Sequence, residues 1–176
     1  VTGGEHDAHM TVGSLTVDVW KGWQRCEFRF TRDGKEILRS REDGDPVTKY
    51  THQAGDMYRI RALFGANEGE HFYGIGQEQQ PCLDRKGTAT DLWHYNTKSA
   101  LPCVYSSLGY YFLWNNPSPG RVEFGRSRTL WEANCAYQAD YIIAAAATPA
   151  IAMRRYAELT GFSPEMPDEG KAVLHK

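Results

Sequence analysis

The chain has 176 residues, of which 41% are hydrophobic and 24% charged, and its formal net charge is −2. This composition is typical of one globular domain rather than of a disordered segment. The sequence shows no cluster of basic residues of the kind that binds nucleic acid. Its longest apolar run, 141–147, is too short to span a membrane.

Hydrophobic and polar residues alternate with a period of two through most of the chain, which predicts strands. The pattern begins at 15–19 and repeats at 26–31. Asp33-Gly34 then predicts a hairpin that leads into 36–38. The polar stretch 40–53 contains Gly44 and Pro46 and is interpreted as a loop or an edge region.

Further strands are predicted at 57–64, 109–114, 121–124 and 136–144, with turn residues between them. Thr148-Pro149 has the character of a helix start, and Ile151, Ala152, Met153, Tyr156 and Leu159 fall on one helical face before Gly161. Many short strands and one late helix indicate an all-β fold, either a sandwich or a barrel.

Four widely spaced cysteines, Cys26, Cys82, Cys103 and Cys135, form no metal-ligand pair. They favour buried free thiols and a reducing compartment. His6 and His9 lack a nearby third ligand, so no metal site is expected. No basic start precedes an apolar segment at the N-terminus, and a removed signal would leave no trace, so the localisation stays unknown.

The segment 72–80 carries Gly74 and Gly76 after an aromatic pair. A dinucleotide loop needs a third glycine and a following helix, so special backbone angles at a strand end are the favoured interpretation and no cofactor is expected. Asp84 and Asp91 flank a probable turn and could face each other as a catalytic pair. Capping or solvated carboxylates are the favoured interpretation, because Arg85 and Lys86 would keep both ionised.

Trp93, His94, Tyr95 and Asn96 combine a flat apolar face with hydrogen-bonding groups, as sugar sites do. Packing in a β core is the commoner role of such aromatic residues, and a structural hydrogen bond is the commoner role of a lone histidine.

Six blocks in fixed order resemble the N-terminal domain of glycoside hydrolase family 31, the α-glucosidases and α-xylosidases. They are FYGIGQEQQ (72–80), LDRKGT (83–88), DLWHYNTKSALP (91–102), SSLGYYFLWNNP (106–117), GRVEFG (120–125) and DYIIAAAATPAIAMRRYAELTG (140–161). The resemblance is close over 72–161 and looser over 11–64.

The resemblance implies an antiparallel, galactose mutarotase-like β-sandwich over 1–147. A connecting helix over 148–162 and a linker over 163–176 would lead toward a (β/α)₈ barrel. In the family that barrel carries the aspartate nucleophile and the aspartate acid/base, so no catalytic residue and no metal are expected here. The implied partners are an α-glycoside and the catalytic barrel domain of the same protein.

The resemblance also implies a rim loop that contacts the bound sugar. Asn96 takes the polar position of the family's motif, Trp93 the aromatic one, and Tyr95 a position often filled by Arg or Thr. The expected function is therefore that of a non-catalytic domain of a retaining exo-α-glycosidase for α-glucosides or α-xylosides.

Two other functions stay open. The first is a free-standing carbohydrate-binding module, which requires the Trp93–Asn96 cluster to be exposed at a concave site. The second is an aldose epimerase, which requires a general acid and base, and His52, His71 and His94 are the available histidines.

Overall fold

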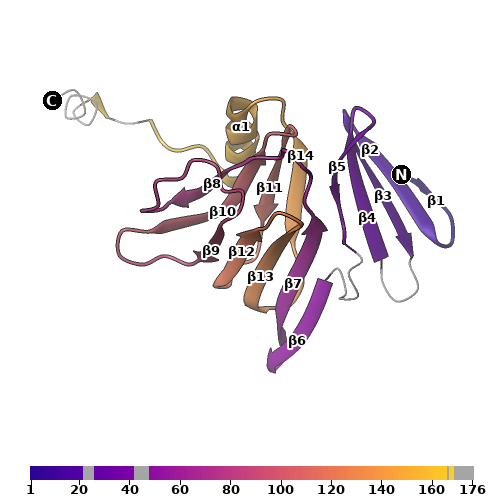
Figure 1. Ribbon diagram of the computed structural model, residues 1–176, viewed down its shortest axis with the longest axis horizontal. Coiled ribbons are helices and arrows are strands. Elements are labelled where there is room, and N and C mark those ends of the chain that lie inside the picture. The colour runs from indigo at the N-terminus through magenta and orange to yellow at the C-terminus, as the bar shows by residue number, and fades with distance from the viewer. Residues whose placement is uncertain (22–25, 42–47, 166, 169–176) are drawn as a thin grey trace.

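The computed structural model describes residues 1–21, 26–41, 48–165 and 167–168, and for residues 48–50 only the backbone. These residues form antiparallel strands and one helix (Figure 1). The strands are β1 (Thr2–Gly3), β2 (Asp7–Val12), β3 (Leu15–Lys21), β4 (Cys26–Arg32), β5 (Lys35–Arg39), β6 (Thr48–Ala54), β7 (Met57–Gly65), β8 (Phe72–Gln77), β9 (Ala89–Leu92), β10 (Ser99–Ser106), β11 (Tyr110–Trp114), β12 (Gly120–Phe124), β13 (Arg128–Ala136) and β14 (Tyr141–Ala145), and the helix is α1 (Pro149–Thr160).

Two of the three sheets pack face to face, which confirms the predicted β-sandwich. One has the strand order β14-β11-β10-β8 and the other β6-β7-β13-β12-β9. Their inner faces share one core, in which the rings of Phe112 and Trp131 stack with centroids 4.8 Å apart. The ring of Phe64 meets that of Phe112 edge-on at 5.5 Å. Such aromatic contacts across the interface bury large areas and fix how the sheets face each other.

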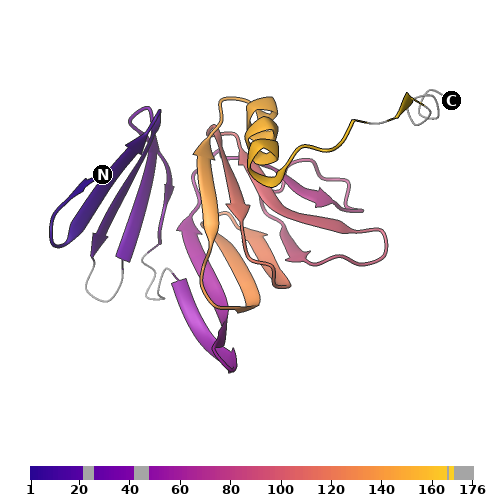
Figure 2. The same cartoon turned by 180° about the vertical axis from the view of Figure 1, so that it is seen from behind.

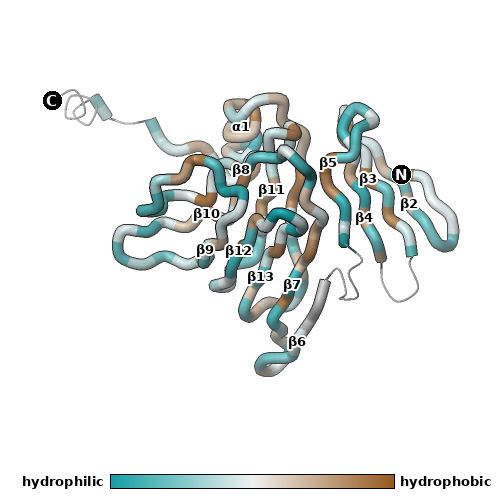
Figure 3. Tube along the Cα trace, viewed as in Figure 1, coloured by the Kyte–Doolittle hydropathy of each residue, from teal (hydrophilic) through white to brown (hydrophobic). Residues whose placement is uncertain are grey.

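The third sheet, β1-β2-β3-β4-β5, is a meander formed by the N-terminal residues (Figure 1). The sequence did not set it apart from the sandwich. Its side chains Phe30, Ile37 and Leu38 belong to the same buried cluster as Ile60 and Phe64, so this sheet extends the core. Figure 3 shows hydrophobic residues along β4 and β5 as well as along the sandwich strands.

Strand β11 is buried along its whole length. Tyr110, Phe112 and Trp114 point into the sandwich core, while Tyr111 and Leu113 belong to a second cluster that includes Ala152 of α1. Alternate residues of a strand lie on opposite faces, so β11 is covered by a sheet on one side and by the helix on the other. Figure 2 shows α1 along the outer side of this sheet.

The predicted hairpin at Asp33-Gly34 is confirmed. Arg32 pairs with Lys35, and the two residues between them have φ values of 50° and 79°, as a type I′ turn requires. Of the predicted loop or edge region 40–53, residues 42–47 lie outside the described residues. Residues 48–53 belong to β6, which is an edge strand, so the edge interpretation holds there.

The prediction of one strand over 136–144 is wrong. Strand β13 ends at Ala136 and β14 begins at Tyr141, and the residues between them form a turn that moves the chain from one sheet to the other. Alternation alone continues through 137–140, so it did not reveal this break.

Gly74 and Gly76 confirm the favoured interpretation of special backbone angles, with φ values of 132° and 84°. A Cβ atom on Gly76 would lie 2.1 Å from the carbonyl oxygen of Ser99, on the neighbouring strand β10. Glycine therefore satisfies both the backbone angle and the close approach of two strands. Ile75 between them also has a positive φ, 72°, and its side chain is fully buried.

The helix begins as predicted, with the Thr148 hydroxyl accepting from the amide of Ile151 at 3.3 Å and Pro149 in the first turn. Gly161 follows as the C-terminal cap. The predicted apolar face is only partly buried, because Ala152 is covered while Ile151, Met153 and Leu159 are 40%, 56% and 51% exposed. No helix within the described ranges is long and apolar enough to cross a bilayer. The predicted linker over 163–176 lies mostly outside the described residues.

All four cysteines are free thiols, as predicted, but the expectation that they are buried is wrong for three of them. Cys26 is exposed, Cys82 and Cys135 are partly covered, and Cys103 alone is buried. Burial raises the pKa of Cys103 to about 12, so its thiol is protonated at neutral pH.

We expect Gly76→Ala to lower the free energy of unfolding much more than Gly87→Ala. Both glycines have a φ of 84°, but nothing lies within 4 Å of a Cβ on Gly87. Gly87→Ala should cost about 1–2 kcal/mol through backbone strain alone, and Gly76→Ala should add about 1–3 kcal/mol from the clash with β10. Urea unfolding of the two variants measures the difference, and equal losses would contradict the packing described for Gly76.

The thiols should differ in reactivity. At pH 8 iodoacetamide should modify Cys26 readily and leave Cys103 unmodified in the folded chain, because the thiolate is the reactive form and Cys103 is both protonated and covered. Peptide mass spectrometry over time gives both rates, with the urea-unfolded chain as the control in which all four react. Fast modification of Cys103 without unfolding would disprove its burial.

Candidate functional site

The three residues predicted to contact sugar lie together in the connection from β9 to β10, which runs from one sheet to the other and folds into a small hairpin closed by an isolated bridge between Tyr95 and Lys98. The amide of Lys98 donates to the carbonyl of Tyr95 at 2.9 Å, and the reverse bond is 3.3 Å long, so Asn96 and Thr97 form the tip. Thr97 has a φ of 67°, as the third residue of a type II turn does. Trp93 and Tyr95 are 40% and 56% exposed, and Asn96 is also exposed. These side chains are therefore available to a ligand or to another domain.

A buried ion pair anchors this hairpin. The ammonium of Lys98 lies 2.8 Å from the carboxylate of Glu78, and each side chain is only 6% exposed. Glu78 belongs to the segment that follows β8, so the pair joins the first of the motif blocks, 72–80, to the third, 91–102. The same ammonium lies 5.4 Å from the ring centroid of Tyr95, within cation–π range. Lys98 of the ion pair thus also contacts an exposed aromatic residue beside the tip.

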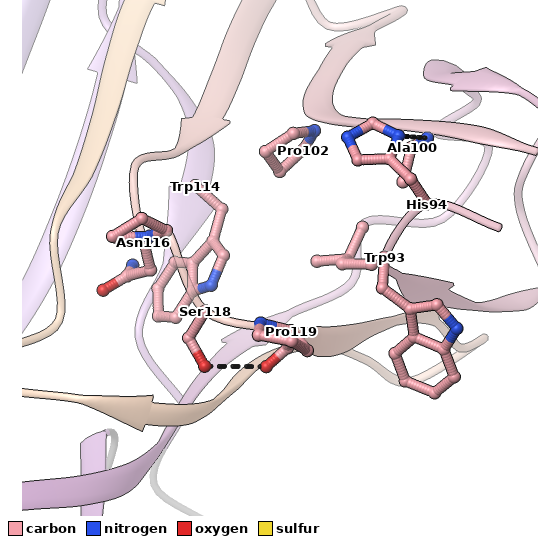
Figure 4. A pocket seen from close by; sticks show the side chains of 10 residues that line it. Trp93, His94, Ala100, Pro102, Trp114, Asn116, Ser118 and Pro119 are labelled. Carbon is pink, nitrogen blue, oxygen red and sulfur yellow. Dashed lines mark hydrogen bonds between the residues drawn. The ribbon is translucent and has the colours of Figure 1, made fainter.

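His94 has a structural hydrogen bond, which agrees with the favoured interpretation of this residue. The backbone amide of Ala100 donates to Nδ1 of His94 at 3.2 Å. Because Nδ1 accepts, the neutral ring carries its proton on Nε2. That second nitrogen remains a donor and lies on the side of the cavity described next (Figure 4).

A cavity of about 440 Å³ lies beside the base of the hairpin (Figure 4). Trp93 and His94 form one side, Trp114 and Asn116 the other, and the rings of Pro102 and Pro119 contribute apolar walls. Tyr95 and Asn96 do not line it. The sequence did not single out Trp114, Asn116 or the prolines. The pairing of β10 with β11 brings Trp114, at the end of β11, next to Pro102 on β10.

Asp84 and Asp91, the two carboxylates of the hypothetical catalytic pair, have different neighbours. Asp84 precedes the turn and accepts from His71 Nδ1 at 2.6 Å and from the amides of Phe72 and Lys86. Partial burial opposes its ionisation, but the bond from His71 and the two amides outweigh this and lower the pKa of Asp84. Asp91 lies on β9 opposite Arg121 of β12. Both positions suit structural carboxylates better than a catalytic pair.

The buried carboxylate of Glu70 is also fully engaged. It accepts hydrogen bonds from the hydroxyls of Ser106 and Tyr110, at 2.5 and 2.7 Å. Burial, followed by the charge of Glu70, raises the pKa of Tyr110 well above its ordinary value. The hydrogen bonds of Glu70 therefore hold the segment before β8 against the turn between β10 and β11.

The two other histidines considered for an epimerase lie on separate parts of the fold. His52, on the edge strand β6, contacts the carbonyl of Gly55 at 2.8 Å, and His71 pairs with Asp84 before β8. No group of three His, Cys, Asp or Glu side chains suited to a metal ion occurs among the residues that the structure describes.

Comparison with known proteins relates this chain to family 31 enzymes, although no protein-family profile matches it. It is 40% identical over 114 residues to an uncharacterized family 31 glucosidase of Pseudescherichia vulneris, covering 65% of this chain and 22% of that protein. It is 32% identical over 154 residues to α-xylosidase A of Aspergillus niger, covering 84% of this chain and 21% of that enzyme.

The structural comparison agrees. A GH31 α-xylosidase from a soil metagenome, solved in complex with xylose, superposes with a TM-score of 0.85 and 32% sequence identity. The match covers 95% of this chain and 27% of that enzyme. The chain thus spans about a fifth of the length of the curated relatives and about a quarter of this structure.

The Glu78–Lys98 pair yields a stability prediction. Lys98→Met should lower the free energy of unfolding by about 3–5 kcal/mol, because it leaves a buried carboxylate without its partner. The double variant Lys98→Met/Glu78→Leu should recover most of this loss. Chemical denaturation measures all three proteins.

The control is Arg154→Met in α1. Arg154 pairs with Glu158 at 3.1 Å, but these side chains are 77% and 52% exposed. Its loss should cost at most about 1 kcal/mol. If the two single variants lose the same stability, the hairpin anchor is not the buried pair described here.

Proposed function

We propose that this chain, a homologue of the family 31 glycoside hydrolases, is a non-catalytic domain of a retaining exo-α-glycosidase. The homology covers the N-terminal β-sandwich region of those enzymes. The observation that carries the proposal is the match to α-xylosidases and a glucosidase, of which the matched region makes up only 21–27%. The longer enzyme would act on α-xylosides or α-glucosides.

The arrangement of carboxylates supports a role outside catalysis. A retaining glycosidase places two carboxyl groups about 5–5.5 Å apart, and one must hold a proton at neutral pH. Asp84 is instead kept ionised by His71 and two amides, Glu70 accepts from two hydroxyls, and Glu78 is paired with Lys98. The nucleophile and the acid/base would therefore belong to a barrel domain of the same polypeptide.

The exposed hairpin would serve as a rim of the sugar site. Trp93 offers an aromatic surface to ring C–H groups, and Asn96 offers both a neutral donor and an acceptor for hydroxyls. The buried Glu78–Lys98 pair would hold these groups in position before a ligand arrives, which reduces the entropy lost on binding. A rim of this kind orients the substrate and leaves bond cleavage to the other domain.

The 176-residue chain should not hydrolyse an aryl α-xyloside or α-glucoside, whereas the longer polypeptide should. In the longer protein, Asn96→Ala should lower kcat/KM by roughly 10-fold, the value of one hydrogen bond to the substrate. Release of nitrophenol from a nitrophenyl α-glycoside measures the activity of the short chain, of the longer protein and of its variants. Tyr137→Ala, at a 70% exposed position in the β13–β14 turn, is the matched control and should leave kcat/KM unchanged.

Turnover by the short chain that disappears on Asp84→Asn or Asp91→Asn would overturn the proposal, because it would place the reacting carboxylates in this domain. If the Asn96→Ala enzyme keeps the original kcat/KM, Asn96 has no role in binding the sugar. The proposal that the domain is non-catalytic would still stand.

A further inference from the structure

Strand β14 lies at an edge of its sheet, where it pairs with β11. The amide of Ala146, just after β14, donates to the carbonyl of Gly109 at 2.8 Å. Bonded and non-bonded residue pairs alternate in an antiparallel ladder, so this bond and the register place the bonds to β11 at even-numbered residues. The main-chain groups of Ile143 and Ala145 therefore point away from β11. Among the described residues, none forms a hydrogen bond to them on that side.

The opposite edge of the same sheet is covered. There the amide of Phe72 on β8 donates to the carboxylate of Asp84 at 3.1 Å, and the carbonyl of Phe72 accepts from the amide of Arg85 at 2.8 Å. Native proteins protect sheet edges by such a cover, or by lysine, proline or a bulge. Strand β14 has the sequence YIIAA, with neither a charged residue nor a proline. Its edge is therefore suited to pairing with one more strand.

An apolar groove lies beside this open edge. Its volume is about 120 Å³, and it is lined by Met10, Val12, Leu15, Val17 and Phe30 from the N-terminal sheet and by Tyr141 and Ile143 from β14. Met10 and Val12 are 42% and 66% exposed. Figure 2 shows β14 as the strand of its sheet that faces the N-terminal sheet. An apolar cavity of about 150 Å³ can hold benzene, so this groove has room for one apolar side chain.

We propose that a further strand pairs with the open edge of β14 and places an apolar side chain in this groove. Its main chain would exchange hydrogen bonds with Ile143 and Ala145. Alternate side chains of such a strand point to opposite faces of the sheet. One set would enter the groove, and the other would lie on the side of Ile142 and Ala144, where α1 packs. The strand should therefore be apolar on both faces and about as long as β14, which has five residues.

The strand would come from the same, longer polypeptide. The matched region makes up only 21–27% of the related glycosidases, so most of such a polypeptide lies outside these 176 residues. A second copy of the chain fits less well, because its own β14 is flanked by its own N-terminal sheet, and the groove has room for a side chain rather than for another sheet. The inference rests on the proposed function only for the existence of the longer polypeptide.

Amide hydrogen exchange at single-residue resolution tests this pairing, in the 176-residue chain and in the longer polypeptide. In the short chain, Ile143 and Ala145 should exchange nearly as fast as unstructured peptides, whereas Ile142 and Ala144, which bond to β11, are the protected internal controls. In the longer polypeptide, exchange of Ile143 and Ala145 should slow by about 100-fold or more, because an amide in a ladder exchanges only when the strand opens.

A charge in the groove should weaken this protection. In the longer polypeptide, Met10→Asp should raise the exchange rates of Ile143 and Ala145 by about 10-fold or more, because the groove would then have to bury a carboxylate. Thr11→Asp is the matched control. Thr11 is the next residue of β2, is also exposed and points to the opposite face of the sheet, so its substitution should leave both rates unchanged.

A second variant tests the main-chain bonds themselves. Ala145→Pro removes an amide that points away from β11, so the short chain should keep its fold and unfold within a few degrees of the original. In the longer polypeptide, the same variant should raise the exchange rate of Ile143 by about 10-fold, because the pairing loses one hydrogen bond.

Exchange of Ile143 and Ala145 as fast in the longer polypeptide as in the short chain would overturn the proposal. Protection that persists in Met10→Asp would exclude the groove, and protection that persists in Ala145→Pro would exclude main-chain pairing; either result rejects the proposed strand. Protection that appears only with rising protein concentration would assign the edge to a second copy and likewise reject it. None of these results depends on kcat/KM, by which the proposed function is judged.

Discussion

The burial of β11 on both faces is the constraint on which the rest of this structure depends. One set of its side chains joins the aromatic core between the sheets, and the other joins the cluster beneath α1. A strand covered on both sides must be apolar throughout, as Tyr110–Trp114 is. Its pairing with β10 fixes the strand into which the small hairpin at 95–98 leads. The candidate site is thus positioned by the core rather than by its own loop.

Much of the fold could be predicted from local patterns. The Asp33-Gly34 hairpin and the Thr148-Pro149 helix start depend on a few adjacent residues whose backbone preferences are strong, and both are confirmed. The break at 137–140 and the exposure of Met153 depend on which surface the chain meets next, and periodicity does not contain that information. The separate N-terminal sheet was missed for the same reason.

The candidate site divides in the same way. Trp93, Tyr95 and Asn96 are adjacent in sequence, so their combination of aromatic and amide groups could be recognised, together with the resemblance to family 31. Trp114 comes from another strand and reads as an ordinary core residue. Only the three-dimensional arrangement brings its indole to the cavity beside the hairpin. Likewise, the Glu78–Lys98 pair joins residues twenty positions apart that carry no sequence signal for contact.

The uncovered side of α1 affects how the chain behaves in solution. Ile151, Met153 and Leu159 on α1, and Phe162 just after it at 68% exposure, are large apolar groups that remain at the surface. With a net charge of only −2, long-range repulsion between molecules is weak. Salts excluded from protein surfaces, such as sulfate, strengthen the attraction between apolar groups. Solubility of the chain should therefore depend more on the type of salt than on small changes of pH, with α1 as the region where molecules first adhere.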